Sequence, residues 1–183
     1  MQRKAPNGIK MKKLIAAAIV MLLLSISTMA QTKAYDVIKD PKEGGWIFDG
    51  LISFADLNTE PTFNWMKSGS DAYMPEEKYV ATLRKSLKDY TIVAFLGTWC
   101  DDSHNLIPKL EKVLTTSGFP PNQLTMYGID RDKKSKTGEE RKYEIKFAPT
   151  IILLKNGKEA GRITETVLKS VEADMAAIVE GGK

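Results

Sequence analysis

The single cysteine of this 183-residue chain, Cys100, is the residue with the clearest chemical potential. It follows a continuous apolar run at 91–96 that ends at Gly97, and apolar residues at helical spacing begin directly after it. A thiol at a helix N-terminus faces unpaired backbone N–H groups and the positive end of the helix dipole, which favour the reactive thiolate. The pattern therefore favours a nucleophilic thiol, although a buried and unreactive cysteine is the commoner case in proteins.

Three polar residues follow the cysteine closely enough to modulate it. Asp101 and Asp102 stabilise the first turn of the predicted helix, but their negative charge opposes thiolate formation. His104 lies one helical turn after Cys100, and we expect a solvated surface histidine, with a Cys–His pair as the alternative. One cysteine and one histidine do not supply the three or four ligands that zinc or copper takes, so we expect no metal site and no cofactor.

The flanking pattern predicts the elements that must position this thiol. Apolar spacing, continuous apolar runs and turn residues indicate alternating strands and helices, with Asn156-Gly157 as a two-residue hairpin turn. The predicted elements are a helix at 75–89, a strand at 91–96, a helix from 101 to Gly118, a strand at 124–129, a solvated loop with a short helix at 133–142, strands at 148–154 and 159–164, and a helix at 167–179.

This order of elements predicts an α/β fold. Parallel strands joined by helices and followed by a hairpin and a closing helix give a three-layer α/β/α sandwich with a central mixed sheet. Residues 31–74 have a weaker pattern, which we interpret as one or two short strands and a wrapping loop whose aromatic residues cover the edge of the core.

Residues 1–30 are typical of a secretory signal peptide. A basic segment ending at Lys13 precedes an uninterrupted apolar run at 14–24, and small residues precede a predicted cleavage site after Ala30. We therefore expect a periplasmic or otherwise exported protein, with no stable membrane span after signal removal because the run is too short.

The charge of the chain without this segment is close to zero. Removing the five cations of residues 1–30 leaves 22 Lys and Arg against 23 Asp and Glu. Because such a protein has no broad positive field to attract a phosphate backbone, we expect no nucleic-acid partner.

Several motifs in one order resemble the thioredoxin family. They are the segment 95–103 around Trp99-Cys100, then Pro108, the segment 143–150 ending in Ala148-Pro149-Thr150, and the turn at 155–158. The chain looks like an exported subgroup common in Bacteroidetes-type bacteria, with a single-cysteine Trp-Cys-x-Asp-Ser site. The resemblance implies a thioredoxin fold and divides the chain into a signal peptide (1–30), an N-terminal extension (31–74) and a thioredoxin-like domain (75–183).

The resemblance also implies a substrate-binding groove. Trp99 should cover the thiol and offer a flat apolar surface. Pro149 should be cis and stand opposite Cys100, which leaves the backbone of Ala148 available to pair with an extended substrate.

Two departures from the family pattern concern turnover. Ser103 replaces the second active-site cysteine, and Ala94 replaces a buried carboxylate that assists the resolving step. Cys100 can therefore attack a disulfide, with Ser103 donating a hydrogen bond to the thiolate, but no thiol of the same chain can release the mixed product.

Three functions remain open at this point. The first is monothiol disulfide exchange on exported protein thiols or disulfides, or with a small thiol, in which an external thiol resolves the adduct. The second is a peptide-binding or trapping module of the cell envelope, and the third is a structural subunit that uses its aromatic extension as an interface. An exposed thiol without a partner in an oxidising compartment also predicts a Cys100-linked dimer.

Overall fold

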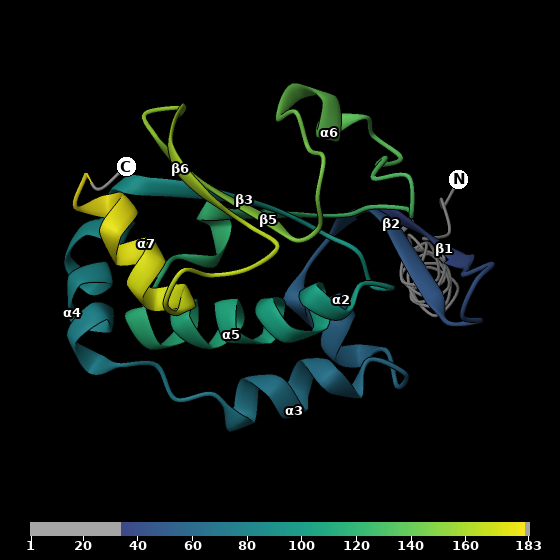
Figure 1. Cartoon of the computed structure of the whole chain (residues 1–183), viewed down its shortest axis with the longest axis horizontal. Helices are drawn as coiled ribbons and strands as arrows, with labels where there is room; N and C mark the ends of the chain where they lie inside the picture. The colour runs from purple at the N-terminus through teal and green to yellow at the C-terminus, as the bar shows by residue number, and fades with distance from the viewer. Residues whose placement is uncertain (1–33, 182–183) are drawn as a thin grey trace, which may run out of the picture. The chain divides into compact units, whose positions relative to one another are not determined.

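The computed structural model describes residues 34–181, which form a six-stranded mixed sheet with helices on both faces (Figure 1). The predicted signal peptide and its cleavage site lie outside these residues. The strand order is β1-β2-β4-β3-β5-β6, in which β3 and β4 are parallel and the other neighbouring pairs are antiparallel. The strands are β1 (Tyr35–Lys39), β2 (Trp46–Ile52), β3 (Tyr90–Leu96), β4 (Leu124–Gly128), β5 (Thr150–Lys155) and β6 (Lys158–Thr164).

The helices are distributed unequally over the two faces of the sheet. In Figure 1, α2 to α5 and α7 lie on one side, and α6 with its flanking loops lies on the other. The helices are α2 (Phe54–Thr59), α3 (Asn64–Ala72), α4 (Glu77–Ser86), α5 (Asp101–Ser117), α6 (Glu139–Lys142) and α7 (Val171–Val179), with 3-10 turns η1 (Leu87–Asp89) and η2 (Pro121–Gln123). The predicted three-layer α/β arrangement with a mixed sheet is confirmed.

Strand β3 occupies the centre of the sheet. Every residue from Ile92 to Leu96 is buried, because helices cover one face of the strand and the α6 region covers the other. A strand buried on both faces should be a continuous apolar run, as the sequence predicted. Its carboxyl end therefore delivers Gly97 and the cysteine loop to the edge of the core.

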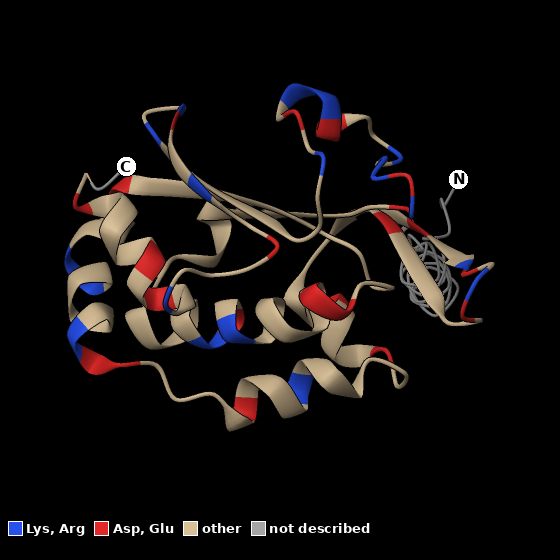
Figure 2. Ribbon diagram, viewed as in Figure 1, with Lys and Arg blue, Asp and Glu red and all other residues tan. Residues whose placement is uncertain are grey.

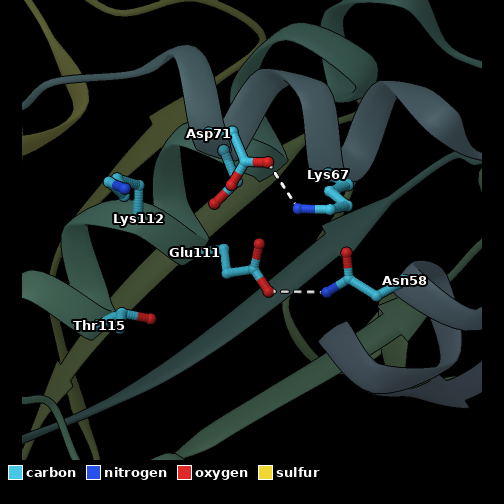
Figure 3. Close-up of a pocket in the computed structure, with 7 residues that line it drawn as sticks. Asn58, Lys67, Asp71, Glu111, Lys112 and Thr115 are labelled. Carbon is cyan, nitrogen blue, oxygen red and sulfur yellow. Dashed lines mark hydrogen bonds and ion pairs between the residues drawn. The ribbon is translucent and has the colours of Figure 1, made fainter.

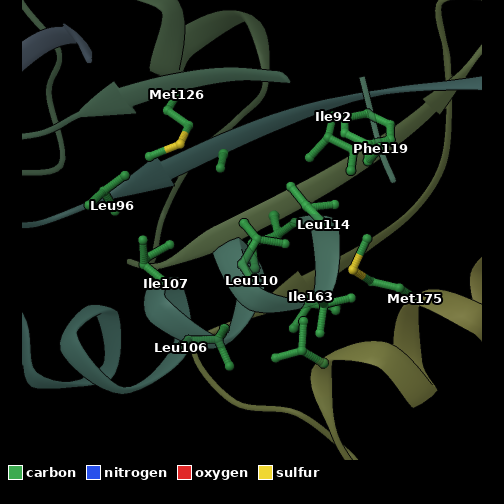
Figure 4. Packing of buried hydrophobic residues seen from close by; sticks show 14 of the residues in the cluster. Ile92, Leu96, Leu106, Ile107, Leu110, Leu114, Phe119, Met126, Ile163 and Met175 are labelled. Carbon is green, nitrogen blue, oxygen red and sulfur yellow. The ribbon is translucent and has the colours of Figure 1, made fainter. Parts of the chain in front are cut away.

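Helix α5 packs its apolar stripe against the sheet (Figure 4). Leu106, Ile107 and Leu110 are at most 2% exposed and belong to the same buried cluster as Leu96 of β3 and Met126 of β4. The helix continues through Pro108, which packs so closely on Gly69 of α3 that a Cβ there would lie 2.8 Å from the proline Cβ. Gly118 ends the helix in the left-handed conformation, with φ of 70°.

The segment before α4 contains more regular structure than the predicted strands and loop. The structure has β1 and β2 there, followed by the helices α2 and α3. Ser53 starts α2 through a capping box, in which Asp56 N–H donates to the serine hydroxyl and the Asp56 carboxylate accepts from Ser53 N–H. The Ser68-Gly69-Ser70 segment lies within α3, and the missing side chain of Gly69 permits the close contact with Pro108.

Helix α7 begins at Val171, four residues later than predicted. Ser170 is its N-cap and accepts from Ala173 N–H at 3.3 Å. The Asp174 carboxylate accepts from Leu168 N–H at 2.6 Å, which holds the preceding residues in a turn. Leu168 is fully exposed and is therefore not part of the apolar helix face, contrary to the predicted pattern.

A buried carboxylate joins α7 to the segment before α4. Glu172 is 1% exposed and accepts hydrogen bonds from Tyr73 Oη at 2.6 Å and Glu76 N–H at 3.1 Å. Burial alone would raise the pKa of Glu172, but these hydrogen bonds outweigh it and lower the pKa. Burial and the same carboxylate raise the pKa of Tyr73. The contact fixes two segments that lie almost a hundred residues apart.

We expect Gly128→Ala to destabilise the fold, because a Cβ on Gly128 would collide with the Phe48 carbonyl where β2 pairs with β4. Crowding of this kind costs about 1–3 kcal/mol in free energy of unfolding. Gly45→Ala is the matched control, since nothing lies within 4 Å of its added Cβ. Urea unfolding of both variants measures the difference, and equal stabilities would contradict this close packing.

Candidate active site

Cys100 is the N-cap residue of α5, as the sequence predicted. Its side chain is half-buried, and Sγ donates a hydrogen bond to the backbone oxygen of Ala148 at 3.2 Å. His104 N–H donates to the Cys100 carbonyl at 3.0 Å, which closes the first turn of the helix. Within the described residues the sulfur accepts no capping hydrogen bond from α5, but Cys100 stands at the N-terminus of this helix, where the positive end of the helix dipole lies.

Ala148 and Pro149 face the thiol from the start of β5. The peptide bond between them is cis, and Ala148 is buried. Glu165 N–H donates to the Pro149 carbonyl at 2.8 Å, so the loop after β6 supports this turn. The Ala148 carbonyl, which we expected to be available to a substrate strand, is occupied by the thiol hydrogen bond.

Ser103 lies one turn along α5 but is directed into the protein. It is fully buried, and its Oγ accepts from Gly97 N–H at 3.2 Å. Among the described residues, no hydrogen bond joins Ser103 to Cys100, which differs from the role that the sequence suggested. The physical reason is that the Gly97 N–H, at the end of β3, needs a buried acceptor, and the serine oxygen supplies it.

Trp99 is fixed beside the thiol by contacts on the β4 side of the site. Its Nε1 donates to the Ile129 carbonyl at 2.8 Å, and the Arg131 guanidinium lies 5.0 Å from the ring centroid. Lys133 Nζ lies 5.8 Å from the same centroid. The indole therefore has a fixed orientation, and cation–π contacts contribute to holding it.

Arg131 is itself held by the turn between β1 and β2. Its Nε and Nη2 donate to the two oxygens of Asp40 at 2.8 and 2.6 Å, and Nη2 also lies 2.9 Å from Glu43. Asp40 is 3% exposed, and the hydrogen bonds from Arg131 lower its pKa to about 2. The Asp40–Arg131 pair connects the N-terminal hairpin to Trp99, and no local sequence pattern indicates it.

Thr98 makes a second connection between the hairpin and the cysteine loop. Its Oγ1 donates to the Trp46 carbonyl at 2.8 Å and accepts from Phe48 N–H at 3.2 Å. No local sequence pattern indicates this role, because a threonine before Trp-Cys is not distinctive. The loop at 97–100 is therefore held by β2 as well as by β3.

His104 is neither the solvated surface residue that we expected nor paired with the thiol. Its ring is stacked on Trp65 of α3 at 4.4 Å between centroids, and Nε2 lies 2.9 Å from the Thr98 carbonyl. Because a carbonyl only accepts, Nε2 carries the proton in this arrangement. Its Nδ1 lies 3.8 Å from an Asp101 oxygen, and both Asp101 and Asp102 are exposed on the first turn of α5.

Other features of the described chain offer no comparable chemistry. A hollow of about 400 Å³ between α2, α3 and α5 is lined by charged and polar side chains (Figure 3). Among them Lys67 pairs with Asp71, and the Asn58 amide donates to the Glu111 carboxylate. Figure 2 shows Lys and Arg mixed with Asp and Glu over the ribbon. Within residues 34–181 no cluster of three or more His, Cys, Asp or Glu is placed to hold a metal ion. No helix in that range is both long and apolar enough to cross a membrane.

The mixed sheet, with a cysteine at the start of the helix after its central strand and a proline opposite, defines a thioredoxin fold. The chain belongs to the thioredoxin family, whose pattern matches residues 58–177. The predicted thioredoxin fold and the resemblance to the thioredoxin family are thereby confirmed, whereas the Bacteroidetes-type subgroup stays a prediction.

Individual relatives match shorter parts of the chain. Thioredoxin of Mycolicibacterium smegmatis is 33% identical over 72 residues, which are 39% of this chain and 62% of that protein. Thioredoxin-1 of Saccharomyces cerevisiae is 29% identical over 86 residues, 47% of this chain and 78% of the yeast protein. The chain thus spans somewhat less than two thirds of the mycobacterial relative.

Among solved structures, Fasciola hepatica thioredoxin is similar with 20% identity and a TM-score of 0.37, covering 56% of this chain and 89% of that one. A Pseudomonas aeruginosa protein of unknown function has 13% identity and a TM-score of 0.46, covering 73% of this chain and 88% of that one.

We expect Asp40→Asn to weaken the fold in a pH-dependent manner. The pKa of Asp40 is lowered in the folded state, so the paired carboxylate stabilises the protein above about pH 4, and this contribution disappears as the pH falls to about 2. The stability difference between wild type and variant should therefore be largest at neutral pH and shrink below pH 4. Urea unfolding at several pH values measures it. Glu43→Gln, which alters a mostly exposed carboxylate, is the control and should have a smaller effect.

Proposed function

We propose that this protein exchanges disulfides through Cys100 alone, and that an external low-molecular-weight thiol completes each cycle. The observation that carries the proposal is the position of Sγ, at the N-terminus of α5 and 3.2 Å from the Ala148 carbonyl beside Pro149. This places one nucleophile next to a backbone edge that can hold an extended polypeptide. Membership of the thioredoxin family supports the same chemistry.

The reaction then has three balanced steps. The Cys100 thiolate attacks one sulfur of a substrate disulfide, the Cys100–substrate disulfide forms, and the other substrate sulfur leaves as a thiolate that takes up a proton. An external thiolate next attacks the Cys100 sulfur of this mixed disulfide, which releases the substrate as a thiol and leaves Cys100 in a disulfide with the external thiol. A second external thiolate then attacks the outer sulfur of that disulfide, which forms a disulfide between the two external thiols and restores the Cys100 thiolate. When two external thiols are consumed per cycle, the substrate disulfide is reduced and those thiols become a disulfide.

The hydrogen bond from Cys100 to Ala148 gives the first step a structural consequence. A thiol donates this hydrogen bond, but a thiolate has no proton to donate. Ionisation of Cys100 therefore releases the Ala148 carbonyl, which becomes available to accept from a substrate backbone N–H. Activation of the nucleophile and opening of the peptide-binding edge are coupled in this proposal.

We further propose that these steps take place outside the cytoplasm, in the periplasm or another exported location, because residues 1–30 have the pattern of a secretory signal. The resemblance of the Trp-Cys-x-Asp-Ser segment supports a Bacteroidetes-type source. A second candidate function is peptide binding without turnover. The exposed side chain of Phe147, 49% accessible next to Ala148, favours it because it adds apolar surface to the same edge. Cys100 would then act as a trap through a mixed disulfide.

We expect the purified protein to form one mixed disulfide with glutathione when it is mixed with glutathione disulfide. Intact-mass spectrometry should detect this adduct on the purified wild-type protein and also on the protein isolated from periplasmic extracts. The Cys100→Ser variant should show no adduct in either sample. Asn105→Ala, an exposed position on the same helix, should form the adduct at the wild-type rate. An unreactive wild-type thiol would contradict exchange and leave the peptide-binding function.

We expect Ser103→Cys to give the protein a dithiol cycle. The new thiol replaces a side chain one helical turn from Cys100, and an intramolecular thiol acts at a higher effective concentration than an external one. The rate of insulin reduction is measured with an electron donor that reduces the dithiol and with no other small thiol. Under these conditions the variant should be about tenfold faster than wild type, or more.

Ser117→Cys is the control for this gain, because it adds a buried cysteine at the far end of α5. A Ser103→Cys protein that forms an internal disulfide and still reduces no insulin would indicate that the groove does not accept disulfide substrates.

A further inference from the structure

A pocket of about 180 Å³ is lined in part by Trp99, the residue before Cys100. Three separate segments form it: the β1–β2 turn, the start of α3 and the cysteine loop with the first turn of α5. Four Trp and Phe side chains dominate its lining, those of Trp46, Phe63, Trp65 and Trp99, and its two acidic residues are Asp40 and Glu43. We call it the aromatic pocket.

The size of the aromatic pocket suits one side chain. Sites for whole small-molecule ligands commonly have volumes of about 300–1,000 Å³. An apolar protein cavity of about 150 Å³ accepts a benzene molecule. At 180 Å³ the aromatic pocket has room for one such ring.

The walls of the pocket are fixed before any ligand arrives. Thr98 joins the cysteine loop to β2, and His104 is stacked on Trp65 while it contacts the Thr98 carbonyl. Trp99 is held by the Ile129 carbonyl and Arg131. A preformed site of this kind loses little conformational entropy on binding.

The charges around the pocket favour a neutral occupant. Lys39 lies 4.6 Å from the Trp46 ring centroid, and Arg131 and Lys133 lie over Trp99, so cations of the protein already occupy these indole faces. Arg131 also pairs with both acidic residues of the lining. A cationic side chain would therefore meet no unpaired carboxylate in the lining, and an anionic one would lie next to two acids.

We propose that the aromatic pocket binds a neutral aromatic side chain of the substrate polypeptide, close in sequence to the disulfide cysteine that Cys100 attacks. The inference rests on the proposed exchange function and names its substrate class: disulfides flanked by Phe or Tyr. Trp99 lines the pocket and precedes Cys100 directly, so their Cα atoms are about 3.8 Å apart. A substrate residue a few positions from the attacked cysteine therefore reaches the pocket when the peptide is extended.

The test compares synthetic peptides that carry one cysteine as a mixed disulfide with glutathione and differ only at flanking positions. Transfer of each peptide to Cys100, followed by intact-mass spectrometry, should be about tenfold faster with a Phe or Tyr flank than with Ala, Lys or Asp. Each rate is divided by the rate of the same protein with glutathione disulfide. Equal normalised rates for all flanks would overturn the inference.

Two variants test whether the preference comes from this pocket. Trp46→Ala removes the half-exposed wall on the hairpin turn, and Thr62→Trp fills the pocket from its exposed rim. In both, the normalised aromatic preference should fall to near one. Leu51→Ala, an exposed apolar position on β2 that does not line the pocket, should retain it. A preference that survives in both pocket variants would contradict the proposal.

A binding measurement separates this inference from the exchange function. A Phe-containing peptide without cysteine should shift the indole N–H resonances of Trp46, Trp65 or Trp99 in wild type, and the matched Lys peptide should not. If Cys100 fails to react with glutathione disulfide but these shifts occur, exchange is wrong and the pocket assignment stands. If exchange proceeds and neither peptide shifts the indoles, the pocket assignment is wrong.

Discussion

The hydroxyl group of Thr98 is the contact on which the architecture of the site depends. Strand β2 pairs with β4 only from Gly50 to Ile52, so the backbone groups of its first half need other partners on that side. Thr98 supplies both an acceptor for Phe48 N–H and a donor for the Trp46 carbonyl. Because buried backbone groups are costly to leave unpaired, this one side chain determines where the cysteine loop meets the N-terminal hairpin.

The Asp40–Arg131 ion pair acts in parallel with Thr98. It links the β1–β2 turn to the loop after β4, and the guanidinium at the same time orients Trp99. A buried ion pair adds little net stability after its desolvation cost, but it penalises arrangements in which either partner is unpaired. Its main effect here is geometric, since it fixes the indole beside the thiol.

The sequence predicted those parts of the structure that depend on local pattern. The buried strand β3, the start of α5 at Cys100 and the Asn156-Gly157 turn follow from apolar runs, helix N-terminal position and turn chemistry, and both turn residues have positive φ. The family resemblance also directed attention to Ala148 and Pro149, which lie at the thiol.

Long-range contacts were not predictable in this way. Asp40 and Arg131 are 91 residues apart, and nothing in either neighbourhood identifies the other. His104 has the spacing of a surface position on α5, but the packing of α3 places Trp65 over it. Ser103 has the position of the family's second cysteine, and only the fold reveals that its hydroxyl satisfies Gly97 N–H. In each case tertiary packing, rather than the local sequence, determines the environment.

The buried carboxylate of Glu172 has a consequence for the order in which the chain reaches its native state. Tyr73 and Glu76 bond to Glu172, which is synthesised 99 and 96 residues after them. The linker between α3 and α4 therefore cannot make these contacts on a nascent chain that lacks α7. Contacts of such high sequence separation slow folding, because a long loop must close before they form. We therefore expect the contacts of Glu172 to form late in folding, once α7 is part of the chain.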